Sequence, residues 1–233
     1  MSHHQAQPCC VHTRENRGLL AVVERRALVW IAERLPPRIN SDHLSGLGLV
    51  AMAAAGLSFA AFRFTPWAAA GVVAALAANW FGDSLDGTVA RVRGQQRPRY
   101  GFYVDHLIDL AGTTLLLAGL ACSTLMSPLA CALLLAAYLL VSAEMYLATH
   151  AAGVFRMSFG GFGPTELRVL LAIGALQAAI DPWVSLHLLG PIRLFDLGAL
   201  VASAGLAVVF VVSAVRNTRA LSVADPRPTR ITD

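Results

Sequence analysis

Charged side chains are scarce in this sequence: 14% of its 233 residues are charged, whereas 56% are apolar. This balance and a mean hydropathy of +0.60 exclude an ordinary soluble protein. Lysine is absent, so all 18 basic residues are arginine, and they form no platform with aromatic residues that would bind nucleic acid. The four cysteines imply no disulfide framework, because two are adjacent near the N-terminus and two lie in apolar segments. These absences leave a protein of the lipid bilayer.

The apolar residues form runs close to the length that crosses a hydrocarbon core, about 20 residues. Short polar turns with Pro, Gly or Arg separate the runs. The pattern predicts an all-α membrane protein with six transmembrane helices, at residues 44–62, 67–79 continuing into the segment at 83, 107–126, 129–149, 167–183 and 197–215. We therefore expect an N-terminal segment (1–43), a six-helix membrane domain (44–216) and a C-terminal tail (217–233).

The arginines predict the orientation in the membrane. If the N-terminus is cytoplasmic, 16 of the 18 arginines lie on the cytoplasmic side, and only Arg63 and Arg193 lie outside. Such a bias is typical of the positive-inside rule. We expect both termini in the cytoplasm and an inner or plasma membrane of bacterial type.

The N-terminal segment contains a shorter apolar run at residues 19–31, which Glu24, Arg25 and Arg26 interrupt. These charges argue against a secretory signal peptide. The helical spacing of the apolar residues predicts an amphipathic helix on the cytoplasmic membrane surface, ending before Pro36 and Pro37. An amphipathic helix that packs on the ends of the bundle is the alternative.

Four aspartates stand out as two pairs. Asp83 and Asp86 are three residues apart and Asp105 and Asp109 are four apart, so each pair projects from one face of a helix. If the two helices meet, the carboxylates repel one another unless some are protonated or divalent cations bind them. Oxygen ligands without His or Cys favour Mg²⁺, Mn²⁺ or Ca²⁺ over Zn²⁺. Two ions sharing these carboxylates would suit in-line displacement at phosphorus.

Small residues follow the first pair on the same helical face. Gly87 and Ala90 would let a phosphorylated ligand approach the backbone, and Arg91 lies within reach of its phosphate. Close packing between membrane helices is the alternative explanation for the two small residues.

Together these residues resemble the signature of the CDP-alcohol phosphotransferase family, in which Asp, Asp-Gly, Ala-Arg, Gly, Asp and Asp recur at fixed spacing. All eight fixed positions are filled, by Asp83, Asp86, Gly87, Ala90, Arg91, Gly101, Asp105 and Asp109. The basic segment of nine residues that joins the two halves of the motif departs from the usual pattern. The resemblance implies a membrane enzyme that moves a substituted phosphate from a CDP-linked alcohol to an acceptor hydroxyl and releases CMP.

The resemblance also implies roles for individual residues. Asp83, Asp86 and Asp105 would hold one Mg²⁺ or Mn²⁺ ion, and Asp83, Asp105 and Asp109 a second. Asp109 would also act as the general base that takes the acceptor's proton. The remaining motif residues would contact the CDP group of the donor: Gly87, Ala90, Arg91 and Gly101.

The donor expected from the size of the chain is CDP-diacylglycerol, with CDP-choline or CDP-ethanolamine acting on diacylglycerol as the alternative. An ion-coupled transporter is a further alternative, because acids within a membrane also line ion pathways. Such a protein would spread its acids along a path or between repeats, whereas these gather at one face. The family resemblance also implies a homodimer.

Other polar residues support weaker hypotheses. Residues 41–43 are either a helix cap or, as the family resemblance implies, a segment that contacts the nucleotide, and Thr165 is a candidate helix cap. Arg156 and Arg168 flank the glycine-rich loop at 158–168, which forms either an acceptor pocket or a helix start. Glu144 has a substrate, hydrogen-bonding or dimer role. Cys9 and Cys10, with nearby histidines, favour an untethered terminus over a metal site.

Overall fold

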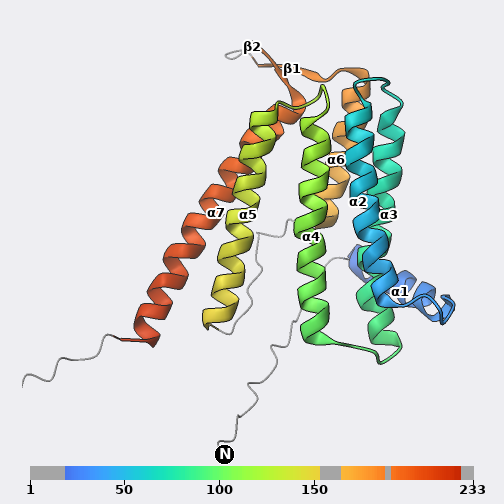
Figure 1. The fold of residues 1–233 in the computed structure, drawn as a ribbon, viewed down its shortest axis with the longest axis vertical. Helices are drawn as coiled ribbons and strands as arrows, with labels where there is room; N and C mark the ends of the chain where they lie inside the picture. Colours follow the sequence, from blue (N-terminus) through green and yellow to red (C-terminus); the bar gives the residue numbers. More distant parts are fainter. Residues whose placement is uncertain (1–18, 153–163, 187–189, 227–233) are drawn as a thin grey trace, which may run out of the picture.

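The computed structural model describes residues 19–152, 164–186 and 190–226. In these ranges the chain forms helices and one short hairpin (Figure 1). The elements are α1 (Leu19–Arg34), α2 (Ser41–Ala61), α3 (Ala68–Val92), α4 (Pro98–Ala121), α5 (Pro128–Ala152), α6 (Pro164–Ile180), β1 (Trp183–Leu186), β2 (Gly190–Arg193) and α7 (Leu194–Ala224).

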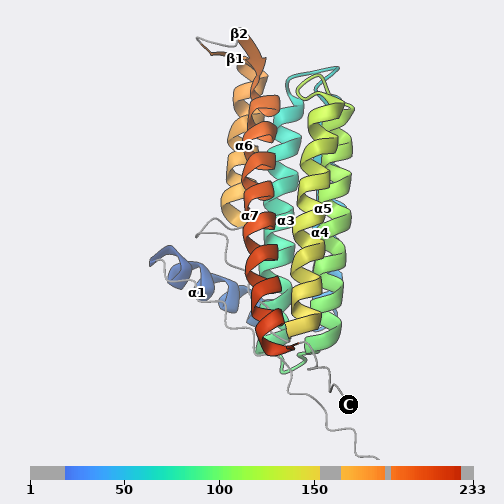
Figure 2. The same cartoon turned by 90° about the vertical axis from the view of Figure 1, so that its left-hand side faces the viewer.

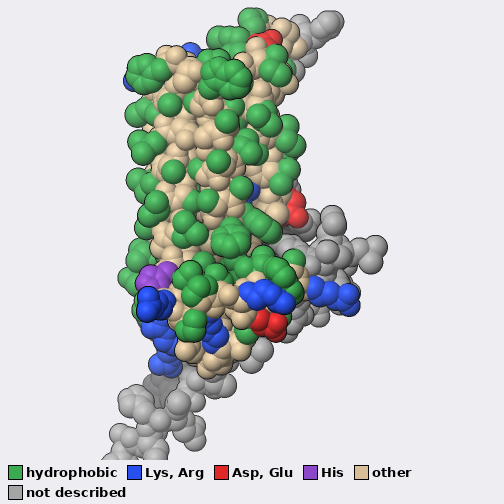
Figure 3. All heavy atoms as spheres, turned by 90° about the vertical axis from the view of Figure 1, so that its right-hand side faces the viewer, with side chains coloured by type: hydrophobic (Ala, Val, Ile, Leu, Met, Phe, Trp, Pro, Cys, Tyr) green, Lys and Arg blue, Asp and Glu red, His purple; other side chains and the backbone are tan. Residues whose placement is uncertain are grey.

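Five of the described helices, α2, α3, α4, α5 and α7, are long and apolar enough to cross a membrane. Helix α6 is shorter, with 17 residues, so the fifth of the six predicted spans stays a prediction. Figure 3 shows apolar side chains over the flank of the bundle, and charged side chains gathered mainly near its lower end. This distribution is that of an integral membrane protein.

Helices α3 and α4 extend further than the hydropathy pattern indicates. We expected the third span to begin at residue 107, but α4 begins at Pro98, a residue whose fixed φ suits the first turn of a helix. Helix α3 continues to Val92. Both aspartate pairs therefore lie inside continuous helices, and the loop between the helices is residues 93–97.

The fifth predicted span was wrong at its C-terminal end. Helix α6 stops at Ile180, because Pro182 disfavours helical backbone at Asp181. Trp183 then begins β1, which pairs antiparallel with β2 in the register Trp183↔Arg193. This hairpin lies at the upper end of the bundle and was not predicted (Figure 1).

Helix α2 packs between α3 and α4, which contribute most of its contacts. Glycines allow these helices to approach closely: a Cβ atom on Gly56 would overlap the backbone of Leu115 in α4, and one on Gly82 would lie 2.7 Å from the carbonyl oxygen of Leu44 in α2. Helix α6 packs on α3, and α7 packs on α5. Helices α3 and α4, which carry the motif, are thus held in place by their common contact with α2.

Helix α1 lies across the lower part of the bundle (Figures 1 and 2). Its buried Leu28 and Ala32 pack with Leu85 and Val89 of α3. This contact supports the alternative in which the helix packs on the bundle. Trp30 nevertheless stays 57% exposed. A location on the membrane surface therefore remains a prediction.

Candidate active site

The four aspartates lie on two helices that both pack against α2. Asp83 and Asp86 lie on α3, and Asp105 and Asp109 lie on α4. The charge of Asp109 interacts with the other three carboxylates, and Asp86 interacts with both Asp83 and Asp105. The four acids of the motif are therefore within electrostatic range of one another.

The two pairs differ in how the protein holds them. Asp83 Oδ2 accepts a hydrogen bond of 2.7 Å from Arg168 of α6. Asp86 Oδ2 accepts one of 2.6 Å from the Ser45 hydroxyl of α2. The side chains of Asp105 and Asp109 are exposed. The acids of α3 are thus oriented by hydrogen bonds from neighbouring helices.

The arginine that holds Asp83 belongs to a short polar network. Arg168 Nε donates to Asn79 Oδ1 at 2.7 Å, and Asn79 Nδ2 donates to the Gly48 carbonyl of α2 at 2.9 Å. Asn79 is buried, so these hydrogen bonds satisfy an amide that would otherwise be costly in an apolar environment. The network ties α2, α3 and α6 together beside the acids.

The donor set suits a hard divalent cation: four carboxylates and a hydroxyl, without thiolate or imidazole ligands. Within the described residues, no three such groups stand close enough to hold one ion. Like charges repel, and Arg168 and Ser45 hold two of the carboxylates. The chemistry of the acids therefore fits a hard divalent cation, and their individual ligand roles remain predictions.

The other motif residues lie next to the acids. A Cβ atom on Gly87 would meet the Nη1 atom of Arg91 at 3.3 Å, and no neighbouring helix lies closer. Close helix packing therefore does not explain this glycine. Arg91 is exposed, and its Nη2 donates to Thr88 Oγ1 at 3.0 Å. Ala90 is half-buried on the same helix.

Gly101 lies in the first turn of α4, which begins at Pro98. A Cβ atom at this position would have no neighbour within 4 Å. The glycine therefore faces open space, and no packing contact requires it.

Two residues of this site were not singled out from the sequence. Asn79 accepts a hydrogen bond from Arg168, and Ser45 donates one to Asp86. A signal existed only for Asn79, because a buried amide in an apolar span needs a polar partner.

The weaker hypotheses have mixed outcomes. Asn40 caps α2 through a capping box with His43, so the cap precedes the proposed residues 41–43. Thr165 is the second residue of α6 and is not its cap. Glu144 accepts a hydrogen bond of 2.7 Å from Asn217 of α7, which supports its hydrogen-bonding role. Arg156, residues 158–163, and the N-terminal cysteines and histidines lie outside the described residues.

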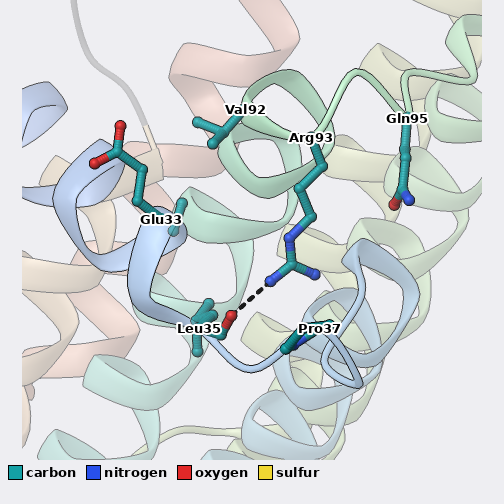
Figure 4. Close-up of a pocket in the computed structure, with 7 residues that line it drawn as sticks. Glu33, Leu35, Pro37, Val92, Arg93 and Gln95 are labelled. Carbon is teal, nitrogen blue, oxygen red and sulfur yellow. Dashed lines mark hydrogen bonds between the residues drawn. The ribbon is translucent and has the colours of Figure 1, made fainter.

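A pocket elsewhere in the molecule lies between α1 and the C-terminal end of α3 (Figure 4). Arg93 projects toward it and donates to the carbonyl oxygens of Leu35, Pro36 and Ile39 at 2.5–3.2 Å. Its guanidinium therefore holds the linker between α1 and α2. None of the four aspartates lines this pocket. The candidate active site is therefore the region of the aspartates, and this pocket is separate from it.

Two comparisons with known proteins give matches to this chain. The sequence model of the CDP-alcohol phosphatidyltransferase family matches residues 44–215. The fold is similar to that of the phosphatidylinositol phosphate synthase PgsA1 of Mycobacterium tuberculosis, crystallised with CDP-DAG bound. The TM-score is 0.57 at 22% sequence identity, and the match covers 88% of this chain and 99% of that one. No curated protein matches the chain.

Proposed function

The chain belongs to the CDP-alcohol phosphatidyltransferase family, and from this premise we propose that it transfers the phosphatidyl group of CDP-diacylglycerol to the hydroxyl of an acceptor alcohol. It is thus a membrane transferase of substituted phosphate groups. The observation that carries the proposal is that four carboxylates in the register of the family motif lie on α3 and α4, where their charges interact. The CDP-DAG in the PgsA1 structure supports a lipid donor.

In the reaction that we propose, the acceptor oxygen forms a new bond to the phosphorus of the phosphatidyl group. The bond from that phosphorus to the oxygen of CMP breaks, and CMP leaves with its electron pair. Asp109, whose side chain is exposed, takes the proton of the acceptor hydroxyl. Atoms and charge balance without any further reactant.

The family generally depends on divalent metal ions. We propose two Mg²⁺ or Mn²⁺ ions, one held by Asp83, Asp86 and Asp105 and one by Asp83, Asp105 and Asp109. The ions would neutralise the diphosphate and stabilise the charge that develops on the leaving CMP. The role of Asp83 and Asp86 is then to present oriented oxygen atoms, since Arg168 and Ser45 already fix one oxygen of each.

Residues beside the acids would bind the CDP group. Gly87 leaves space above α3, and Arg91 lies within 3.3 Å of that space. A guanidinium at this position would donate to the diphosphate after leaving its contact with Thr88. Ala90 and Gly101 keep the neighbouring surface free of bulky side chains.

We also propose that the site and both termini face the cytoplasm, in a bacterial-type inner membrane, and that the protein is a homodimer. The arginine distribution supports this orientation, since Arg91, Arg93, Arg97 and Arg99 all lie at the lower end of α3 and α4. The dimer rests on the family resemblance alone.

The test is CMP release by the purified full-length protein with Mg²⁺ or Mn²⁺, CDP-diacylglycerol and a panel of acceptors such as glycerol phosphate, an inositol phosphate and serine. Asp109→Asn should abolish metal-dependent release. Asp196→Asn is the matched control, because Asp196 lies at the opposite end of the bundle and accepts a hydrogen bond from Ser127 N that an asparagine oxygen can also accept. CMP from CDP-choline or CDP-ethanolamine with diacylglycerol, and none from the lipid donor, would assign the other donor class. Folded protein that releases no CMP from any pair contradicts the proposal.

A further inference from the structure

Arg168 is an unusual residue for its location. It lies in the first half of α6, a mostly apolar helix, and its side chain is 14% exposed. A charge in such an environment is costly unless it is paired and hydrogen-bonded. Arg168 is both: it forms an ion pair with Asp83 at 2.7 Å and a hydrogen bond with Asn79.

The geometry of the pairing restricts Asp83 more than a single contact would. Asn79 and Asp83 lie one turn apart on α3, so the planar guanidinium spans that turn with two donors, Nε and Nη2. Asn79 cannot yield easily, because its own amide is bonded to the backbone of Gly48 on another helix. The hydrogen bonds to Asn79 and Asp83 therefore fix the orientation of the Arg168 guanidinium, and the guanidinium in turn fixes the orientation of the Asp83 carboxylate.

The charge of Arg168 acts on a second carboxylate as well. Its positive charge partly offsets the repulsion that Asp109 experiences from the three other aspartates. Arg168 thus interacts with an acid of α3 and with an acid of α4, although it lies on α6. This position beside the acids distinguishes it from Arg93, whose guanidinium donates to the backbone carbonyl groups of the linker between α1 and α2.

We propose that Arg168 is a positioning residue that orients Asp83 for cation binding and is not the ligand of an acceptor phosphate. The proposal rests on the proposed function, in which Asp83 is a cation ligand. It deepens that function by assigning a task to α6, a helix that contributes none of the motif residues.

The experiment measures Mn²⁺ binding to the full-length protein in detergent, without donor or acceptor, by the electron paramagnetic resonance signal of free Mn²⁺. Arg168→Lys keeps the charge but loses the two-donor fork, so we expect the Kd for Mn²⁺ to rise about 10-fold, as is typical when a residue that orients a metal ligand is changed. Asn79→Ala should act in the same direction but more weakly, by about 3-fold, because Asn79 acts only through Arg168. The double variant should bind Mn²⁺ no more weakly than Arg168→Lys, since both changes disturb one network.

Arg93→Lys is the matched control, and its Kd for Mn²⁺ should equal that of the wild type. In turnover assays, Arg168→Lys should lower kcat and leave the KM for the acceptor within about 2-fold of the wild type, as expected for a residue without contact to the acceptor.

Two results would overturn the proposal. Unchanged Mn²⁺ binding with a raised acceptor KM would make Arg168 an acceptor ligand, and a lowered melting temperature as the sole effect would make it a structural link. If Arg168→Lys does not fold, the same measurements of Mn²⁺ binding, acceptor KM and melting temperature on Asn79→Ala test the proposal. Should the wild type bind Mn²⁺ and the variant bind it weakly while no donor yields CMP, the positioning role stands and the proposed function fails.

Discussion

Gly82→Ala is the substitution that best tests how the packing of α2 and α3 supports the site. Gly82 precedes Asp83 and faces α2. A Cβ atom there would lie 2.7 Å from the Leu44 carbonyl oxygen and 3.0 Å from Gly48 N, whereas ordinary contacts begin at 3.4 Å. Both neighbours are backbone atoms, which cannot rotate away. The two helices must therefore separate by about 0.7 Å, the difference between 3.4 and 2.7 Å.

This separation has two measurable consequences. Overpacking of this kind typically costs about 1–3 kcal/mol of unfolding free energy. It also stretches the hydrogen bond between Ser45 on α2 and Asp86 on α3 from 2.6 Å toward about 3.3 Å, near the limit of a useful hydrogen bond. Since a displacement of about 1 Å in a catalytic group can cost about 100-fold in rate, we expect CMP release to fall by about 10- to 100-fold.

The measurements are thermal unfolding in detergent and initial rates of CMP release at saturating Mn²⁺. Gly46→Ala is the control, because Gly46 lies on α2 and a Cβ atom there has no neighbour within 4 Å. Alanine is the better helix former by about 0.5–1 kcal/mol, so this variant should be at least as stable as the wild type and fully active. If Gly82→Ala matches Gly46→Ala in both assays, the close contact of α2 and α3 does not position the acids.

Three further predictions concern side chains around the bundle. Ser45→Ala removes the donor to Asp86, and we expect the Mn²⁺ concentration for half-maximal activity to rise about 3- to 10-fold, measured by titration of CMP release. Glu144→Ala removes the hydrogen bond to Asn217 and should lower the unfolding free energy by about 1 kcal/mol, whereas Glu144→Gln should lower it less and both should keep full activity. Arg97→Ala removes an ion pair at the surface and should leave the melting temperature unchanged, and a clear decrease would contradict this.

The pairing of the aspartates within each helix could be predicted because it depends on local geometry. Residues three or four apart share one face of a helix, so the spacing within each aspartate pair is enough to place its carboxylates together. A shift of Asp105 by one residue would turn it by about 100° around α4, away from α3. The apolar runs likewise predicted α2 and α5 to within a few residues, because burial in lipid requires a minimum length.

Helix ends near charged residues could not be predicted in the same way. Hydropathy falls where Asp83 and Asp105 begin, so the pattern suggested that the spans end or begin there. Backbone hydrogen bonds within a helix do not depend on hydropathy, and inward-facing charges are tolerated when they have partners. Helix α3 therefore continues to Val92, through the motif.

The partners of the acids were beyond prediction for a different reason. Arg168 is 85 residues from Asp83 in the sequence, and Ser45 is 41 residues from Asp86, so no local periodicity connects them. Packing alone decides which side of α3 meets α2 and which meets α6. The spacing of the motif therefore predicts which carboxylates gather, but only the assembled bundle determines in which direction each one points. Positioning residues such as Arg168 consequently belong to helices that the motif does not include.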